Sequence, residues 1–406
     1  MKSTLQVLLA LMFCAYSSYH KTDPVKPTEV DDLNKSGYAF DVNVVRINSE
    51  YSEFACSMFR EKLVIVSSKT IGAFGPGIDS KTNEPFTDLY YLDVGKNGNF
   101  SRTSWFSRIL NTKANEGQVA FSKDENTIYY TRSDIHNTSN YKLYKAELRR
   151  NAPGKWFDEL ELAISSNDYS VESPHVSADG KFLYFSSNME GGFGGFDIYM
   201  ARIYKDGGIG TPVNLGNKIN SIEDEKYPFT SKDNKELYFS STGHESMGGY
   251  DIFISNRLDG VYTAPRNLGR AVNSDKDEIA FVMINTKSGV FSSNKAKKSN
   301  TYNMYHFEAK MLYKELQGVI TTEDRKILPN VTVVLLNSEG QEIERQKTNV
   351  DAAYHFKIKP FENYQIIAEK EGFENYTLDL KPSANSQHSV LKMQPKVEVS
   401  YNKVKH

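Results

Sequence analysis

The sequence predicts an all-β protein, with a five-bladed β-propeller over residues 38–310 and a small β-sandwich over residues 311–395. Three observations predict this fold class. A pair of short strands recurs five times at a regular spacing, and turn-forming residues separate the strands. The chain also contains 25 Tyr and 23 Phe, and these residues favour pleated, half-buried sheet surfaces.

The N-terminal residues predict export. The apolar run Leu5–Phe13 has the length of a signal-peptide core and is too short to span a bilayer. We place the cleavage near Ser17, which gives a signal peptide over 1–17 and a linker over 18–37. Cys14 leaves open a lipoprotein signal, in which that cysteine carries the lipid. Both readings predict a protein of the periplasm or outer membrane of a Gram-negative bacterium.

Two strands define the repeat. The second of them begins at five equivalent places, 52 to 55 residues apart: Asp88-Leu89-Tyr90, Lys142-Leu143-Tyr144, Asp197-Ile198-Tyr199, Asp251-Ile252-Phe253 and Asn303-Met304-Tyr305. The first strand lies 11 residues upstream in four copies, as in Tyr184–Asn188. In the first copy the offset is 21 residues, which predicts an insertion around Ile71–Phe86. We expect a specific contact of the ring at this insertion first.

Two further elements complete each copy. A strand and a tight turn precede the pair, as in Pro174–Gly180, where Asp-Gly suits a hairpin. A fourth element ends in Leu or Ile near an Asn: Ile109–Asn111, Ile164–Asn167, Ile219–Asn220 and Val272–Asn273. Four short strands in about 50 residues are the pattern of a propeller blade. The fifth copy lacks this element, but Val42–Asn48 has its form, so we predict that the N-terminal strand completes the last blade.

The strings Asp179–Asn188 and Gly194–Tyr199 resemble the TolB-type, WD-like propeller repeat. After Lys310 the pattern changes to some seven short strands, among them Pro329–Leu336 and Tyr364–Ala368, which predict the sandwich. This second part is similar to the carboxypeptidase regulatory-like (transthyretin-like) domain. That domain usually has Asp-Gly where this chain has Asp351-Ala352, and the resemblance implies a spacer or adhesion module without catalysis.

The order of the two domains resembles a narrower group, the OmpA-family envelope proteins linked to type IX secretion and gliding. The resemblance implies partners among outer-membrane or secretion-apparatus proteins. The fuller relatives continue into a peptidoglycan-binding OmpA-like domain. This chain reaches His406 after a short polar tail over 396–406, so we expect that domain to be absent and do not extend cell-wall anchoring to this chain.

The sequence predicts no enzyme active site. Gly243–Gly248 is the nearest pattern to a nucleophile elbow, but its spacing is wrong and no helix follows. Gly191–Gly195 resembles a phosphate loop only in composition, because a strand follows at Ile198. The eight His show no zinc-protease spacing, and we interpret His175 and Cys56 as packing residues. We therefore expect no catalytic residue, no metal ligand and no cofactor.

One repeat position holds Asp88, Asp197 and Asp251. Three carboxylates in a ring can bind a cation at a central channel. Lys142 and Asn303 take the same position in the other blades, however, and an Asp before a strand often accepts hydrogen bonds from nearby backbone N–H groups. We favour this structural role.

The charge pattern points away from nucleic acid. A formal net charge of −2 gives no general attraction to nucleic acid or to an anionic membrane. Glu223–Glu225 and Asp275–Glu278 occupy matching stretches of two blades, and they predict either an acidic patch or, as we favour, solvated loops.

Together these features favour a non-enzymatic interaction or scaffold protein of the cell envelope. Extracytoplasmic binding of a glycan or peptide is the first alternative, with the channel or one propeller face as the site. A propeller hydrolase is a weaker alternative. Nucleic acid and small-molecule cofactors are not expected as partners.

Overall fold

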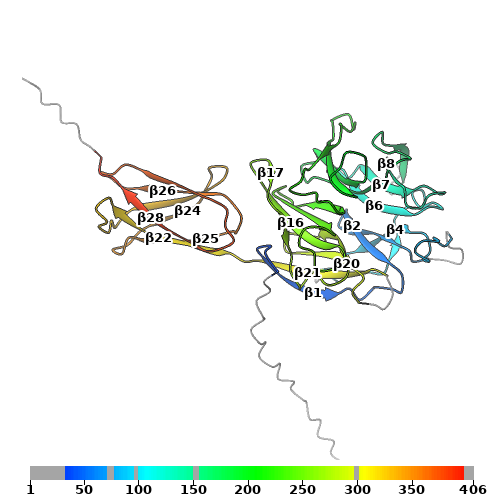
Figure 1. The fold of residues 1–406 in the computed structure, drawn as a ribbon, viewed down its shortest axis with the longest axis horizontal. Helices are drawn as coiled ribbons and strands as arrows, with labels where there is room; N and C mark the ends of the chain where they lie inside the picture. The colour runs from blue at the N-terminus through cyan, green and yellow to red at the C-terminus, as the bar shows by residue number, and fades with distance from the viewer. Residues whose placement is uncertain (1–32, 71–76, 96–98, 150–154, 297–300, 397–406) are drawn as a thin grey trace, which may run out of the picture.

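The computed structural model describes residues 33–70, 77–95, 99–149, 155–296 and 301–396, which form two all-β units (Figure 1). Every regular element in these ranges is a strand, so the predicted all-β class is confirmed. The signal peptide over 1–17, Cys14 and most of the tail lie outside the described residues. The insertion around Ile71–Phe86 is described from Gly77 onward.

Five antiparallel sheets build the propeller. Blade 1 contains β2 (Glu53–Phe59), β3 (Lys62–Ser67), β4 (Asp88–Asp93) and β5 (Ser104–Trp105). Blade 2 contains β6 (Glu116–Phe121), β7 (Thr127–Ser133), β8 (Tyr141–Leu148) and β9 (Trp156–Glu161). Blade 3 contains β10 (Val171–Val176), β11 (Phe182–Ser187), β12 (Asp197–Arg202) and β13 (Val213–Asn214). Blade 4 contains β14 (Glu225–Thr230), β15 (Glu236–Ser241) and β16 (Asp251–Leu258), with β17 (Val261–Tyr262) and β18 (Arg266–Asn267) both paired to β16.

The N-terminal strand closes the ring. Blade 5 consists of β19 (Glu278–Met283), β20 (Ser288–Ser293), β21 (Asn303–Met311) and β1 (Tyr38–Val44). β1 pairs antiparallel with β21 from Tyr38↔Met311 to Val44↔Tyr305. The first strand therefore supplies the outer strand of the last blade, as the count of repeat elements predicts, although the strand ends at Val44 rather than continuing to Asn48.

In blades 1 to 4 the predicted fourth element is not a strand, which corrects the sequence analysis. The outer strands of blades 1, 3 and 4 lie just upstream of it and are only two residues long where they pair with the third strand. The Leu/Ile-Asn element is the connection that follows. Its asparagine binds the backbone of the third strand: Asn220 accepts a hydrogen bond from Ile198 N (2.8 Å) and donates one to Ile198 O (3.0 Å). Asn48 makes the same pair of bonds to Met304.

The middle strands explain why the blades stack. β11, β15 and β20 are buried over almost their whole length, because each blade packs both of its faces against its neighbours. Between blades 1 and 2 this packing forms a cluster of aromatic rings, with Phe59, Phe106 and Phe121 around the buried Trp156. Burial of such rings is the main stabilising contribution in a fold of this kind.

The second unit is a two-sheet sandwich. One sheet has the order β25 (Ala353–Ile358), β22 (Lys314–Thr322), β28 (Gln387–Met393), and the other β24 (Glu342–Lys347), β23 (Thr332–Asn337), β26 (Tyr364–Glu369), β27 (Tyr376–Leu380). Tyr354, Phe356 and Ile358 alternate into the shared core. Ala352 has a φ of 53°, the left-handed conformation that the usual glycine adopts at lower cost.

The sandwich contacts blades 4 and 5 at one side of the propeller. Arg266 stacks over the Phe361 ring at 3.7 Å, and Lys235 Nζ lies 3.0 Å from a Glu339 carboxylate oxygen. We call this side the turn face, because it holds the tight turns 122–126, 177–181 and 231–235. The opposite side is the mouth face, formed by loops 77–87, 134–140, 188–196 and 242–250 and by the blade connections 106–115, 162–170, 215–224 and 268–277.

Candidate binding face at the mouth of the channel

The innermost strands β2, β6, β10, β14 and β19 line the axis of the ring and contact one another in turn. The cavity between them has a volume of only about 20 Å³, and all five strands contribute to its wall. This is room for about one water molecule. This cavity on the axis is therefore too small to hold a ligand side chain.

Every inner strand has an irregularity in its pairing to the second strand. At this position Ser173, Tyr227 and Ala280 have φ between 52° and 57°. A bulge with a left-handed residue bends the strand and redirects a side chain. Of these three residues only Tyr227 is not buried, and it is the only one with a large side chain.

Four blades have an aromatic residue at the mouth-face end of the third strand. The repeat position directly before Asp88, Lys142, Asp197, Asp251 and Asn303 holds Thr87, Tyr141, Phe196, Tyr250 and Tyr302, and the four aromatic residues are partly exposed. Burial raises the pKa of Tyr141, Tyr250 and Tyr302 above the usual value for tyrosine. Nearby carboxylates raise these pKa values further. All four positions lie where a mouth-face loop meets the third strand of a blade. We call these four residues, together with Tyr227, the aromatic ring.

Two carboxylates hold the aromatic ring in place. Asp224 accepts hydrogen bonds from Phe196 N (2.7 Å) and from the Tyr250 hydroxyl (3.0 Å). Asp277 accepts bonds from Tyr250 N (3.0 Å) and from the Tyr302 hydroxyl (2.7 Å). Each aspartate thus joins the third strands of two successive blades. The acidic stretches of the sequence contain these residues, so they are neither a plain patch nor free loops.

A lysine ammonium already lies among these groups. Lys226 Nζ lies 3.5 Å from the centre of the Phe196 ring and 3.0 Å from a carboxylate oxygen of Glu172. Lys226 and Glu172 occupy the same position on neighbouring inner strands, β14 and β10. The mouth therefore stabilises a cation through one aromatic face and one carboxylate.

Exposed apolar side chains lie around the aromatic ring on the loops of the mouth face. They are Ile78, Ile135, Phe193 and Ile222, with 59%, 57%, 49% and 82% of their surface exposed. The described part of the blade-1 insertion is anchored to blade 2, because Asp79 accepts a hydrogen bond from Asn115 Nδ2 (2.7 Å). The predicted insertion thus contributes to the rim of the mouth.

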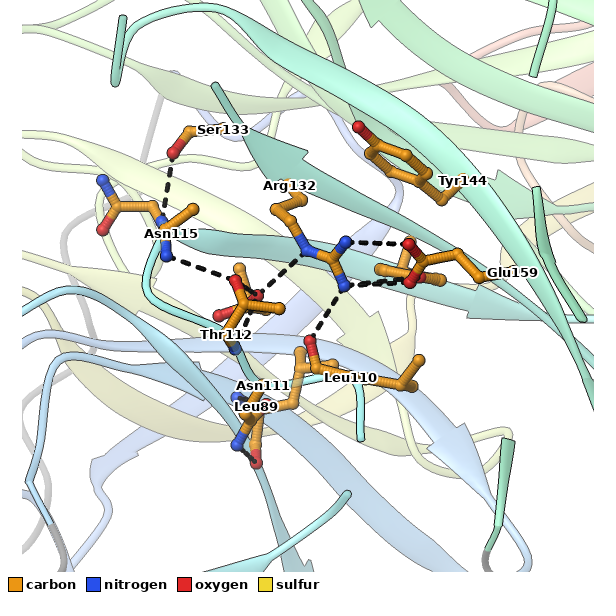
Figure 2. A network of polar contacts seen from close by, with 12 residues as sticks. Leu89, Leu110, Asn111, Thr112, Asn115, Arg132, Ser133, Tyr144 and Glu159 are labelled. Atoms are coloured by element: carbon orange, nitrogen blue, oxygen red, sulfur yellow. Dashed lines mark hydrogen bonds and ion pairs between the residues drawn. The ribbon is translucent and has the colours of Figure 1, made fainter. Parts of the chain in front are cut away.

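Below the mouth, buried glutamates join neighbouring blades. Glu53, Glu116, Glu225 and Glu278 begin four of the five inner strands, and each accepts a hydrogen bond from a Ser or Thr four residues earlier. At Glu116, Arg132 Nε lies 3.2 Å from the glutamate. Figure 2 shows the other guanidinium nitrogens of Arg132 in contact with Glu159 and Leu110 O. His244 and Lys295 approach Glu225 and Glu278 at 3.8 and 3.9 Å.

The repeated aspartates do not face the axis. Asp197 accepts hydrogen bonds from Phe193 N (2.6 Å) and Asn214 Nδ2 (2.7 Å), and Asp251 from Met247 N (2.8 Å) and Asn267 Nδ2 (2.7 Å). This is the structural role that the sequence favoured. In the described residues no group of three or more His, Cys, Asp or Glu is placed to hold a metal ion.

The residues weighed for chemistry are engaged in structure. The Ser246 hydroxyl donates to Ser241 O (3.0 Å) and Gly243 O (2.7 Å), not to His244. His175 Nε2 accepts a hydrogen bond from Thr230 N (2.9 Å), and burial lowers the pKa of this imidazole to about 3. Burial raises the pKa of the Cys56 thiol to about 12, so the thiol stays protonated.

Two recurring sequence patterns could have indicated the buried glutamates and the aromatic ring, but the alignment of the repeats did not include them. One is the recurrence of Asn-Ser/Thr followed by Glu four residues after the Ser or Thr, found at Asn48, Asn111, Asn220 and Asn273. The other is the aromatic residue directly before the repeat position of Lys142, Asp197, Asp251 and Asn303. Both lie just outside the strand strings by which the repeats align.

No protein-family model matches the chain, and no curated protein sequence matches it. Solved structures resemble it at low identity. TolB from Acinetobacter baumannii is 15% identical with a TM-score of 0.32, and the match covers 62% of this chain and 52% of TolB, so the chain spans about half of that protein. An α-L-arabinofuranosidase from Lactobacillus brevis is 11% identical with a TM-score of 0.43, covering 74% and 95%. A protein of unknown function from Dyadobacter fermentans is 10% identical with a TM-score of 0.40, covering 68% and 100%. Similarity at this level assigns neither a family nor an activity.

Among the described strands and loops there is no helix long and apolar enough to cross a membrane.

Proposed function

We propose that this protein is a non-enzymatic interaction protein of the bacterial cell envelope, exported to the periplasm or outer membrane, and that it docks partner proteins on its mouth face. The observation that carries the proposal is the aromatic ring with its rim of exposed apolar side chains, on the side away from the sandwich. Exposed apolar groups gathered on one face are typical of protein interaction sites. The sandwich acts as a spacer. Partners of the outer membrane or secretion apparatus, and a relation to the OmpA-family proteins of type IX secretion, remain part of this proposal.

The carboxylates at the mouth favour binding over hydrolysis. Glycoside hydrolysis uses two carboxyl groups free to act on the scissile bond. Here Glu172 is paired with Lys226, while Asp224 and Asp277 accept hydrogen bonds from backbone N–H and tyrosine hydroxyl groups. A glycan remains the alternative ligand, because aromatic faces can stack on sugars as well as on protein groups.

A photo-crosslinking residue in place of Ile222 tests the proposal in the native envelope. We expect it to capture one or a few envelope proteins. The same residue in place of Tyr204, which is 51% exposed on the turn face, is the matched control and should capture none of them. Equal capture from both positions, or capture from neither, contradicts the proposal.

A further inference from the structure

We propose that the sandwich latches the ring of the propeller. Its connection 359–363, between β25 and β26, holds the chain segment 33–37 in place, and this segment keeps β1 docked in blade 5. We call residues 33–37 the entry segment, because they lead into the first strand. The latch gives the sandwich a role beyond that of a spacer, and it does not depend on the proposed docking face.

On its propeller side the entry segment is fixed to blade 4, although β1 belongs to blade 5. Lys35 N donates a hydrogen bond to Asn267 O (3.2 Å), and Lys35 O accepts one from Arg266 Nε (3.0 Å). At the start of β1 the Tyr38 hydroxyl donates to Glu236 (2.7 Å), the first residue of β15. The residues that lead into the last blade are therefore bound to the blade before it.

The other side of the entry segment faces the sandwich. Leu312 N donates to Gly37 O (2.9 Å), so the two-residue connection from β21 to β22 lies against the segment. A Cβ atom on Gly37 would lie 2.8 Å from Pro360 Cγ and 3.4 Å from the Phe361 ring, which leaves no room for a larger residue. Gly37 also has a φ of 90°, a conformation that glycine adopts readily. The segment is thus enclosed between blade 4 and the sandwich.

Phe361 connects these two sides. The centre of its ring lies 3.7 Å from the guanidinium carbon of Arg266, the same arginine that donates to Lys35 O. Phe361 has a φ of 62°, a left-handed conformation that is rare for a bulky residue and persists only where the surroundings hold it. Arg266 therefore links a strained residue of the sandwich to the backbone of the entry segment.

These contacts matter most for β1 because it is an end strand. Among the described strands it pairs only with β21, and its other edge is free. Elements with few contacts open locally at lower cost than buried strands. A sandwich that is merely tethered needs only the covalent connection after β21, and its loss of contact with Arg266 would leave β1 unaffected. A latch predicts that β1 opens more often when this contact is removed.

Hydrogen–deuterium exchange of the full chain, measured by mass spectrometry, tests the latch. Phe361→Ala removes the ring from Arg266, and we expect the amides of β1 to exchange about tenfold faster. The buried strands β7 and β11 in blades 2 and 3, and β23 in the sandwich core, should keep their wild-type rates. Phe361→Leu keeps an apolar side chain without an aromatic face and should accelerate β1 less. Ile327→Ala, at a residue 58% exposed between β22 and β23, is the control and should change nothing.

A second variant tests whether Phe361 acts through the arginine. Arg266→Met removes both the stacking partner of Phe361 and the hydrogen bond to Lys35 O, so β1 should exchange at least as fast as in Phe361→Ala. In the double variant β1 should exchange no faster than in Arg266→Met alone, because side chains that act as a unit are not additive. Full additivity of the two substitutions contradicts the link through Arg266.

Two results overturn the latch as a whole. Unchanged exchange of β1 in Phe361→Ala makes the sandwich a tether only. Equal acceleration of β1, β7 and β11 makes the effect a general loss of stability. If β23 also loses protection in Phe361→Ala, the same two criteria apply to Phe361→Leu. Crosslinking from Ile222 tests the docking face separately, so each proposal can fail without the other.

Discussion

The boundary between blades 2 and 3 differs from the other four. There the inner strand begins with Val171, which is fully buried among apolar residues, whereas the other inner strands begin with a buried glutamate. Glu225, for example, accepts hydrogen bonds from Ser221 N, Ser221 Oγ and Ser241 Oγ at 2.6–2.7 Å. The first position of the inner strand thus accepts either a glutamate or an apolar side chain. The glutamate requires hydrogen-bond donors around it, and the apolar side chain does not.

The buried glutamate with its Ser or Thr donor, which we call a lock, is therefore not required at every boundary of the ring. In blade 3 the Ser187 hydroxyl, whose counterpart Ser293 donates to Glu278, donates instead to Ser170 O (2.7 Å). The bond from Ser170 N to Asn188 Oδ1 (2.8 Å) is shared with blade 5, where Asp277 N donates to Asn294 Oδ1 (3.0 Å). A buried carboxylate is stable only with all its donors in place. Single substitutions at the glutamate boundaries should therefore lower the free energy of unfolding more than a substitution at the Val171 boundary.

The largest effect is expected from Glu225→Ala. It leaves three donors without an acceptor in the interior and should lower the free energy of unfolding by about 4 kcal/mol. Val171→Ala removes only hydrocarbon and should cost about 2 kcal/mol. Urea unfolding followed by tyrosine and tryptophan fluorescence measures both. The distinction between the two kinds of boundary fails if Val171→Ala costs as much as Glu225→Ala.

A slightly smaller loss, about 3 kcal/mol, is expected from Val171→Glu, because the new carboxylate is buried without its donors. Blade 3 has Asn167 four residues earlier, where the other junctions have Ser or Thr. Adding Asn167→Ser should recover about 1 kcal/mol of the free energy of unfolding, because the serine hydroxyl can donate a hydrogen bond to the new carboxylate. If the double variant is no more stable than Val171→Glu, the Ser-to-Glu spacing does not create the lock.

Arg132→Met tests the cation at one lock (Figure 2). Burial raises the pKa of Glu116 to about 7, and Thr112 and Arg132 counteract this rise. Without Arg132 the ionised carboxylate is more costly, and we expect a loss of between about 2 and 3 kcal/mol at pH 8. At pH 5.5 Glu116 is already protonated, so the loss should be smaller. A loss independent of pH contradicts the role of Arg132 at this lock; Arg149→Met, at an exposed arginine, is the control.

The wild-type protein should itself be more stable in mild acid. Burial raises the pKa of Asp88 and Asp251 to about 6 and that of Glu116 to about 7. A carboxyl group with a raised pKa in the folded state contributes stability below its unfolded pKa, near 4, and loses it as the pH rises through 6 to 7. We expect unfolding free energy at pH 5.5 to exceed that at pH 8 by about 2 kcal/mol. A higher stability at pH 8 contradicts this ordering.

The sequence predicts the propeller well because its signal is local and repeated. Strands such as Phe182–Ser187 recur with their spacing, and the odd element at the N terminus indicates how the ring closes. The sequence does not predict the outer strands of blades 3 and 4. Each of these strands pairs over only two residues, which leaves no periodic pattern to detect.

The mouth and the locks were less predictable for a different reason. The aromatic ring combines residues from four blades, and only the circular arrangement of the blades gives Tyr141 and Tyr302 equivalent places around the axis. Glu225 and Glu278 appear in the sequence as parts of acidic runs, and their charge does not distinguish them from the exposed Glu223 and Asp275. Charge in the sequence does not indicate which residue of a run is buried.

The pairing of β1 with β21 has a consequence for how the chain reaches its folded state. Asn48 and Met304, which bind each other at this seam, are 256 residues apart in the chain. Contacts of such long separation form late, because a long loop must close before they are gained. We expect four blades to assemble first and the first strand to dock last, so that the chain keeps one unpaired sheet edge until its synthesis has passed the propeller.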